Sequence, residues 1–185
     1  MGIHTDRLNR SFTAFIEKQP FFFVATAAPK GRVNVSPKAL DTLRVISPTE
    51  ITWLSVSGSG NETAAHVIQD PRMTLMFCSF EGDPLTLRTY GQAEVFHPRD
   101  DEWEKLYALF PDYAGARNIF RLKIDLVTTS CGTSLPEMEI IRYRAETDLV
   151  PWYAELGADG VMAFWKKKNV TSLDGAPTGI FEGRP

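Results

Sequence analysis

A stretch rich in Ser and Gly, residues 57–66, carries the residue types best suited to hold an anion. It follows residues 51–56, where β-branched and aromatic residues in near alternation predict a strand. It leads into an apolar run from Ala64 that predicts a short helix ending before Pro71. Glycines let the backbone approach a ligand closely, and amides and hydroxyls at a helix N-terminus favour negative charge. The expected guest is the phosphate of a nucleotide-like cofactor.

The same residue types also suit an ordinary helix start. Asn61 or Ser59 could cap the helix, and Glu62 is favourable in its first turn. The stretch is neither a Walker A loop nor a dinucleotide-binding glycine fingerprint. On the residues alone, simple capping and an anion site both stay open.

Length and composition predict one globular domain. The 185 residues are enough for one well-buried core. We expect a single domain over residues 1–185, with its core at about 20–130 and a helical extension at about 145–178. The net charge of −3 argues against nucleic acid or an anionic membrane as the main partner.

The cysteines and histidines predict neither a disulfide framework nor a metal site. Cys78 and Cys131 are the two cysteines, and the three histidines are isolated in the sequence. There is no charged-then-apolar leader and no apolar run near twenty residues, so we expect a cytoplasmic protein without a membrane span.

The remaining pattern consists mostly of strands joined by short turns. A first helix, capped at Thr5 or Asp6, ends at Pro20. Residues 21–28 predict a strand buried on both sides, and residues 33–36 predict its hairpin partner, which ends or bulges at Pro37. Further strands are expected at residues 43–46, 51–56, 72–80, 85–95 and 118–128, with helices beginning at Pro98 and covering residues 149–165. Six or so antiparallel strands with flanking helices indicate a mainly β (α+β) protein, a small barrel or sandwich.

Several short motifs, taken in order, resemble one known family. They are residues 24–26, 31–38, 57–66, 70–77 and 88–91, followed by Ser130-Cys131-Gly132 and Ser172-Leu173-Asp174-Gly175. From about residue 21 to 178, the chain resembles the pyridoxamine 5′-phosphate oxidase-like family of FMN-binding split barrels, in particular an uncharacterised branch of flavoproteins.

The resemblance implies a six-stranded antiparallel split β-barrel that forms a homodimer, with FMN held in a cleft at the subunit interface. Carried over by position, the cofactor-binding residues form three groups. Those on the strand along the isoalloxazine ring and phosphate are Ser36, Pro37, Lys38 and Ala39. Leu54 and Ser55 match the strand pair that contacts the flavin. The loop and helix start near the phosphate match Ser57, Gly58, Ser59, Asn61, Glu62 and Thr63. Lys38 offers the cation that a phosphate dianion needs.

Two departures from the family pattern bear on function. The Arg-Lys pair that holds the phosphate in characterised oxidases is replaced by Thr63 and Ala64, so the phosphate would rely on Lys38, hydroxyls and amides, or on an arginine such as Arg88 or Arg44. No Arg-Leu-x-x-Arg pattern follows residue 128, which argues against vitamin B6 oxidation.

The resulting hypothesis is an FMN-dependent oxidoreductase acting on a small molecule, with no residue assigned a catalytic role and no metal. The alternatives are a non-catalytic module that stores or senses FMN, and a pocket for haem or a deazaflavin. Cys131 is interpreted as a loop cysteine near the flavin rather than a nucleophile, because nothing basic adjoins it in sequence. We interpret His66 as a packing residue.

Overall fold

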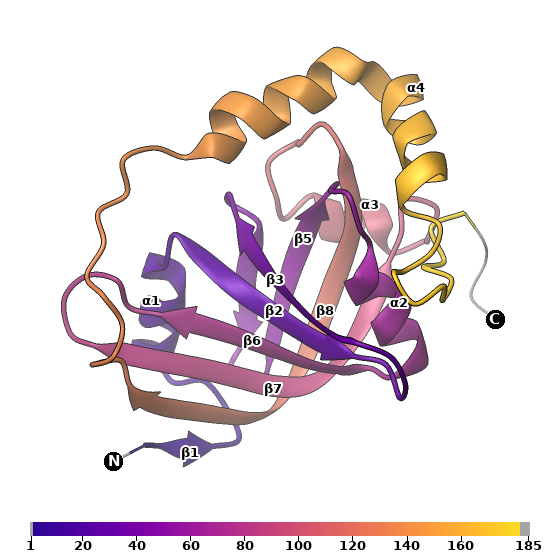
Figure 1. Ribbon diagram of the computed structural model, residues 1–185. Helices are drawn as coiled ribbons and strands as arrows, with labels where there is room; N and C mark the ends of the chain where they lie inside the picture. Colours follow the sequence, from indigo (N-terminus) through magenta and orange to yellow (C-terminus); the bar gives the residue numbers. More distant parts are fainter. Residues whose placement is uncertain (1, 182–185) are drawn as a thin grey trace.

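One curved antiparallel sheet forms the body of the protein in a computed structural model that describes residues 2–181 (Figure 1). Its strands lie in the order β3-β2-β6-β7-β8-β5-β4, and β1 pairs with β8. The hydrogen-bonded path ends at β3 and β4, so the barrel is split rather than closed. The strands are β1 His4–Thr5, β2 Phe21–Ala27, β3 Val33–Ala39, β4 Leu43–Ser47, β5 Glu50–Val56, β6 Arg72–Cys78, β7 Leu85–Phe96 and β8 Ala116–Cys131.

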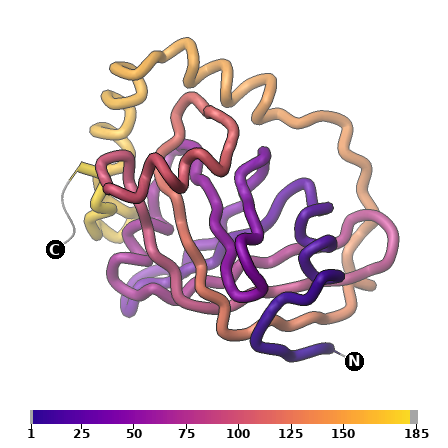
Figure 2. Tube along the Cα trace, turned by 180° about the vertical axis from the view of Figure 1, so that it is seen from behind, coloured from indigo at the N-terminus to yellow at the C-terminus, as the bar shows by residue number. Residues whose placement is uncertain are grey.

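Helices flank this sheet. They are α1 Arg10–Lys18, α2 Glu62–Gln69, α3 Trp103–Tyr107, the π-helical turn η1 Ala145–Leu149 and α4 Val150–Lys168. Figures 1 and 2 show α4 arching over one end of the sheet, with a bend inside it. The bend is at Gly157, whose φ of +64° lies in the left-handed region that glycine tolerates.

The predicted fold class, a mainly β split barrel with flanking helices, is confirmed. The predicted count of six strands is too low, because residues 2–181 contain eight. Strand β1 matches none of the stretches predicted as strands, because its two residues are too few to show an alternating pattern.

Two predictions about the first hairpin are wrong. Strand β2 is not buried on both sides, since buried Phe22, Val24 and Thr26 alternate with half-buried neighbours. Strand β3 does not end at Pro37 but continues to Ala39. It tolerates the proline because it is the last strand on its side of the sheet, where a missing N–H breaks no ladder.

Two predicted helix starts are also displaced along the chain. Helix α1 is capped by Asn9, whose side-chain oxygen accepts a hydrogen bond from the Phe12 amide, rather than by Thr5 or Asp6. Helix α3 begins at Trp103, and residues 98–102 form the turns before it. In the first place a polar residue compatible with a cap stands a few positions early, and in the second place a proline typical of a first helical turn does.

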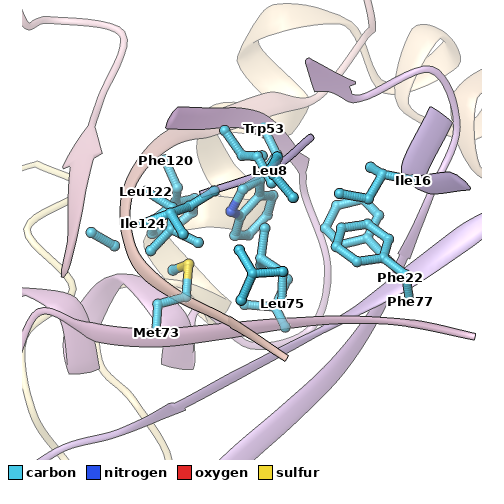
Figure 3. Packing of buried hydrophobic residues seen from close by; sticks show 14 of the residues in the cluster. Leu8, Ile16, Phe22, Trp53, Met73, Leu75, Phe77, Phe120, Leu122 and Ile124 are labelled. Atoms are coloured by element: carbon cyan, nitrogen blue, oxygen red, sulfur yellow. The ribbon is translucent and has the colours of Figure 1, made fainter. Parts of the chain in front are cut away.

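The sheet encloses an apolar core, which Figure 3 shows from close by. Trp53 on β5 is fully buried, and its ring stacks on Phe120 of β8 at 4.4 Å between centroids. Leu8 and Ile16, which precede the barrel in sequence, close the same core from the α1 side. The core therefore fixes β5 and β8 against each other, and these strands carry the site described below.

Within residues 2–181, no helix is long and apolar enough to cross a membrane.

Replacing Leu75 by Ala tests the importance of this core. Leu75 is completely buried, so the Leu75→Ala variant should lose about 2–5 kcal/mol of unfolding free energy. Urea unfolding followed by far-UV circular dichroism measures this loss. Leu173→Ala is the matched control, because that side chain is 75% exposed, and its loss should stay within about 0.5 kcal/mol. Equal losses in the two variants would contradict the assignment of the core.

Candidate functional site

A cleft of about 1310 Å³ lies between β3, β5, the start of α2 and the segment that precedes α4. The loop after β5 forms one part of its wall, because β5 runs straight into the Ser- and Gly-rich stretch. Residues 139–145 and Leu149 form the opposite part. The cleft therefore combines the predicted anion-binding stretch with a C-terminal segment to which the sequence assigned no role.

The structure brings all but one of the predicted cofactor-binding residues together around this cleft. The residues that line it are Ser36, Pro37, Lys38, Ala39, Leu54, Ser55, Ser57, Gly58, Ser59, Asn61, Glu62 and Thr63. Arg88 does not line it and instead donates a hydrogen bond to Ser130 at 3.2 Å. Arg44, the other arginine considered for the phosphate, is paired with Asp41. The binding roles themselves stay predictions.

The buried arginine of the cleft is Arg117, which was not among the predicted site residues; Arg142 and Arg144 line the cleft from the exposed segment before α4. Arg117 is 3% exposed and makes no ion pair within the described part of the chain. Its guanidinium instead donates to neutral acceptors: the carbonyl of Gly60 and Oδ1 of Asn169, both at 2.8 Å, and Oδ1 of Asn118 at 3.1 Å. Burial lowers the pKa of Arg117 to about 10, so it stays charged at neutral pH.

Lys38 is a second cation in the same cleft. Part of its surface is open to the cleft, and its ammonium nitrogen lies 5.7 Å from the centre of the Trp53 ring. Burial lowers the pKa of Lys38 to about 8, and the charge of Arg117 contributes to this shift. No acidic side chain within residues 2–181 forms a salt bridge with Lys38.

Helix α2 begins at the wall of the cleft with donors that have no partner in the described residues. Asn61 stands at its N-cap, but the side chain makes no capping bond, and the buried Nδ2 atom has no hydrogen-bond partner in the described residues. The first amides of a helix also lack intrahelical acceptors, and the helix dipole favours negative charge there. Of the two interpretations of this stretch, simple side-chain capping by Asn61 is therefore wrong.

Two other predicted residues are committed to the protein itself. The Ser57 hydroxyl donates to the Gly115 carbonyl at 2.6 Å and accepts a bond from the indole of Trp165 at 2.7 Å. The Glu62 carboxylate accepts a bond from the Leu173 amide at 3.0 Å. These groups shape the wall, and the Ser57 hydroxyl has no second proton to donate to a ligand.

The segment after α4 fastens this wall. Asn169 joins two parts of it, because its Oδ1 accepts from Arg117 while its Nδ2 donates to the Gly58 carbonyl at 2.9 Å. The Ser-Leu-Asp-Gly motif holds the first hairpin in place, because Asp174 pairs with the Arg32 side chain and accepts a hydrogen bond from the Arg32 amide at 2.8 Å. The C-terminal loop thus holds both the Gly-rich loop and the β2–β3 turn.

Two residues weighed for chemistry lie outside the cleft. His66 is buried, and its Nδ1 lies 3.1 Å from the hydroxyl of Thr26, in agreement with a packing role. Cys131 is the last residue of β8 rather than a loop residue; it is exposed and does not line the cleft, and its predicted place near the flavin stays a prediction. A hydrogen bond with Thr133 lowers the pKa of its thiol.

The groups that line the cleft suit a ligand with an anionic group attached to an uncharged body. Two cations without carboxylate partners, an orphaned amide nitrogen and a helix N-terminus supply the attraction for negative charge. Pro37, Ala39 and Leu54 supply apolar wall. A phosphate ester of a planar organic group meets both requirements.

Comparisons with known proteins agree in one family. The family model described as pyridoxamine 5′-phosphate oxidase matches residues 8–131. A pyridoxamine 5′-phosphate oxidase family protein, ustO of Aspergillus flavus, is 34% identical over 146 residues, which make up 76% of this chain. The chain spans 58% of the length of that curated relative.

Solved structures share the fold. HupZ of Group A Streptococcus superimposes with a TM-score of 0.52 at 16% identity, over 64% of this chain and 91% of its own. A candidate pyridoxamine 5′-phosphate oxidase of Lactobacillus delbrueckii gives a TM-score of 0.53 at 21% identity, over 66% of this chain and 94% of its own.

Replacing Asn169 by Ala tests the link between the C-terminal segment and the site wall. Asn169→Ala removes a partner from both Arg117 and the Gly58 carbonyl, and each buried polar group left unsatisfied costs about 1–3 kcal/mol. The unfolding free energy should fall by at least the lower figure in urea titrations. Gln92→Ala, an exposed amide on β7, is the control, and its change should stay within about 0.5 kcal/mol. A variant as stable as the parent would show that this link contributes nothing.

Proposed function

Because the chain belongs to the pyridoxamine 5′-phosphate oxidase family, we propose that it is an FMN-dependent oxidoreductase acting on a small molecule. The observation that carries the proposal is the pair of cations in one cleft, Lys38 and Arg117, with no acidic partner in the described residues. A buried positive charge without a counter-charge is costly to desolvate. A phosphate monoester, which carries about −1.5 to −2 charges at pH 7, would offset that cost.

The residues that would hold FMN divide by chemistry. Arg117, Lys38 and the amide of Asn61 would hold the phosphate, and the first amides of α2 would add neutral donors. The apolar residues of β3 and β5 would contact the uncharged part. When bound, a flavin supplies hydride or single-electron transfer, while the protein supplies binding, orientation and electrostatics.

The chain's own part in the reaction is to orient the reactants and exclude water. Of the two acids that line the cleft in the described residues, Glu62 is bonded to the Leu173 amide and Glu139 stands on the exposed segment before α4. We assign no general acid or base. This shortage of proton-transfer groups supports, as the second candidate, a module that binds FMN without turnover.

The haem alternative is weaker. The described lining of the cleft contains no His, Cys or Met to ligate iron and only the exposed Tyr143 as a phenol ligand, whereas a deazaflavin that carries a phosphate would use the same donors. Oxidation of a reduced nicotinamide with an added electron acceptor distinguishes an oxidoreductase from a storage module.

We also propose that a second copy of the chain completes the assembly. Strand β3 ends the sheet, and its Val33 and Val35 are 72% and 60% exposed, an apolar edge that pairing would cover. The cytoplasmic location stays a prediction from the sequence.

Replacing Lys38 by Met tests the phosphate site. The change keeps much of the side-chain length but removes the charge, so FMN affinity should fall roughly 10- to 100-fold, as expected for one charge-assisted hydrogen bond. The affinity for riboflavin, which lacks the phosphate, should change less than about threefold. Fluorescence titration of each flavin measures both values, and Lys18→Met, at an exposed position on α1, is the control. Failure of the parent chain to bind FMN would overturn the proposal, whereas equal losses for the two flavins would remove Lys38 from the phosphate site.

The lowered pKa of Lys38 predicts a pH dependence. Lys38 is mostly protonated below its pKa of about 8 and loses its charge above it, while the phosphate stays a dianion throughout that range. FMN affinity should therefore fall between pH 7 and pH 9, and riboflavin affinity should fall less. In Lys38→Met, the affinities for FMN and riboflavin should depend on pH to the same extent. A preference for FMN that rises with pH would contradict this electrostatic account.

A further inference from the structure

The segment that leads from β8 to α4 contributes apolar side chains to the mouth of the cleft. We call residues 138–145 the strap; Figure 1 shows this part of the chain running from the end of β8 to the start of α4. Ile140, Ile141 and Tyr143 on the strap line the cleft and are 41%, 93% and 45% exposed. Charged neighbours surround them: Glu139, Arg142 and Arg144. Apolar patches with a polar rim are typical of ligand-binding grooves.

The strap approaches the cleft from the end away from the start of α2. The register of the hairpin places Phe21 opposite Ala39, at the far end of β3 from Asn34. Asn34 lies beside the start of α2, since its amide is 3.4 Å from the Thr63 hydroxyl. Five residues of strand separate the two ends, about 17 Å.

Two contacts anchor the strap at the Phe21 end. The Met138 amide donates to the Phe80 carbonyl at 3.0 Å, and the Phe80 ring stacks on Phe21 at 5.1 Å between centroids. From there the chain crosses the mouth and returns at Leu149, which packs in the same cluster as Val56. The strap thus bounds the part of the cleft that lies away from the start of α2.

The cleft is large enough for this part to hold a ligand of its own. Its volume of about 1310 Å³ exceeds the roughly 300–1,000 Å³ of a pocket that takes one drug-sized molecule. The charged side chains of the strap do not fill it with a fixed network, since Arg142 turns back toward Thr147 and Asp148 of the following turn. Water against an almost fully exposed isoleucine is unfavourable, and an apolar ligand would displace it.

We propose that the strap forms the substrate side of the cleft and selects a small molecule with an apolar body. This inference rests on the proposed function, because it places the substrate beside a bound flavin. Binding removes Ile140, Ile141 and Tyr143 from water, so affinity grows with the apolar surface of the substrate. The strap lies beyond residues 8–131, which match the family model, so this selectivity does not follow from that match.

A series of 4-alkylphenols tests the proposal. Equilibrium dialysis against the FMN-loaded protein gives the affinity for phenol, 4-ethylphenol and 4-butylphenol. Each buried methylene should raise affinity about fourfold. The affinity gain per methylene should shrink in Ile140→Ser and in Ile141→Ser, and Ile140→Leu should retain it. The matched control is Ile46→Ser, since Ile46 on β4 is 46% exposed but does not line the cleft.

The outcomes separate this inference from the proposed function. Absence of FMN binding would overturn the proposed function and this inference with it. FMN binding with affinities independent of alkyl length, or with equal increments in strap and control variants, would overturn the inference alone. Sedimentation of the same variants measures self-association. If a strap variant loses self-association but keeps its affinity gain per methylene for the alkylphenols, a second copy of the chain covers the isoleucines. That result would also overturn the inference.

Discussion

The site depends on a guanidinium held inside the protein by neutral groups. Arg117 is almost completely buried, and carbonyl and amide oxygens satisfy its donors. Those dipoles replace part of the lost hydration, but they do not cancel the charge. The remaining field reaches the rest of the cleft and contributes to the lowered pKa of Lys38. An anionic ligand is the remaining way to neutralise the pair.

The fold is arranged so that this guanidinium meets its acceptors. Strands β5 and β8 pair with an irregularity between Ser55 and Val56, just where Arg117 lies on β8. Gly115 precedes it at a φ of +80°, and a side chain there would meet the Tyr153 ring at 2.7 Å. The tight approach lets the Gly115 carbonyl receive both the amide and the hydroxyl of Ser57. The packing of α4 against Gly115 and the hydrogen bonds that Gly115 accepts from Ser57 therefore act together on the loop that follows β5.

The sequence predicted the local parts of this arrangement and missed the long-range ones. Strands with clear alternation, such as residues 51–56, and the Ser- and Gly-rich loop follow from patterns that a few neighbouring residues define. Strand β3 continues through Pro37 because of its place at the end of the sheet, which no local pattern encodes. Arg117 reaches the cleft through partners 52 and 57 positions away, Asn169 and Gly60, so its role requires the tertiary structure. Ser57 lines the cleft, but contacts from the distant Trp165 and Gly115, which no local pattern encodes, occupy its hydroxyl.

The central claim, that an unneutralised Arg117 makes the cleft an anion site, is tested most directly by Asn169→Asp. The change keeps the size of the side chain and the acceptor 2.8 Å from Arg117, and it gives the guanidinium a carboxylate partner. It also removes the donor to the Gly58 carbonyl, a loss that Asn169→Ala shares without adding a charge and so controls for. Measured by titration calorimetry at pH 7, the preference for FMN over riboflavin should fall at least about tenfold, as for the loss of one charge-assisted bond. Riboflavin affinity should stay close to that of the parent. An unchanged preference for FMN would contradict the account.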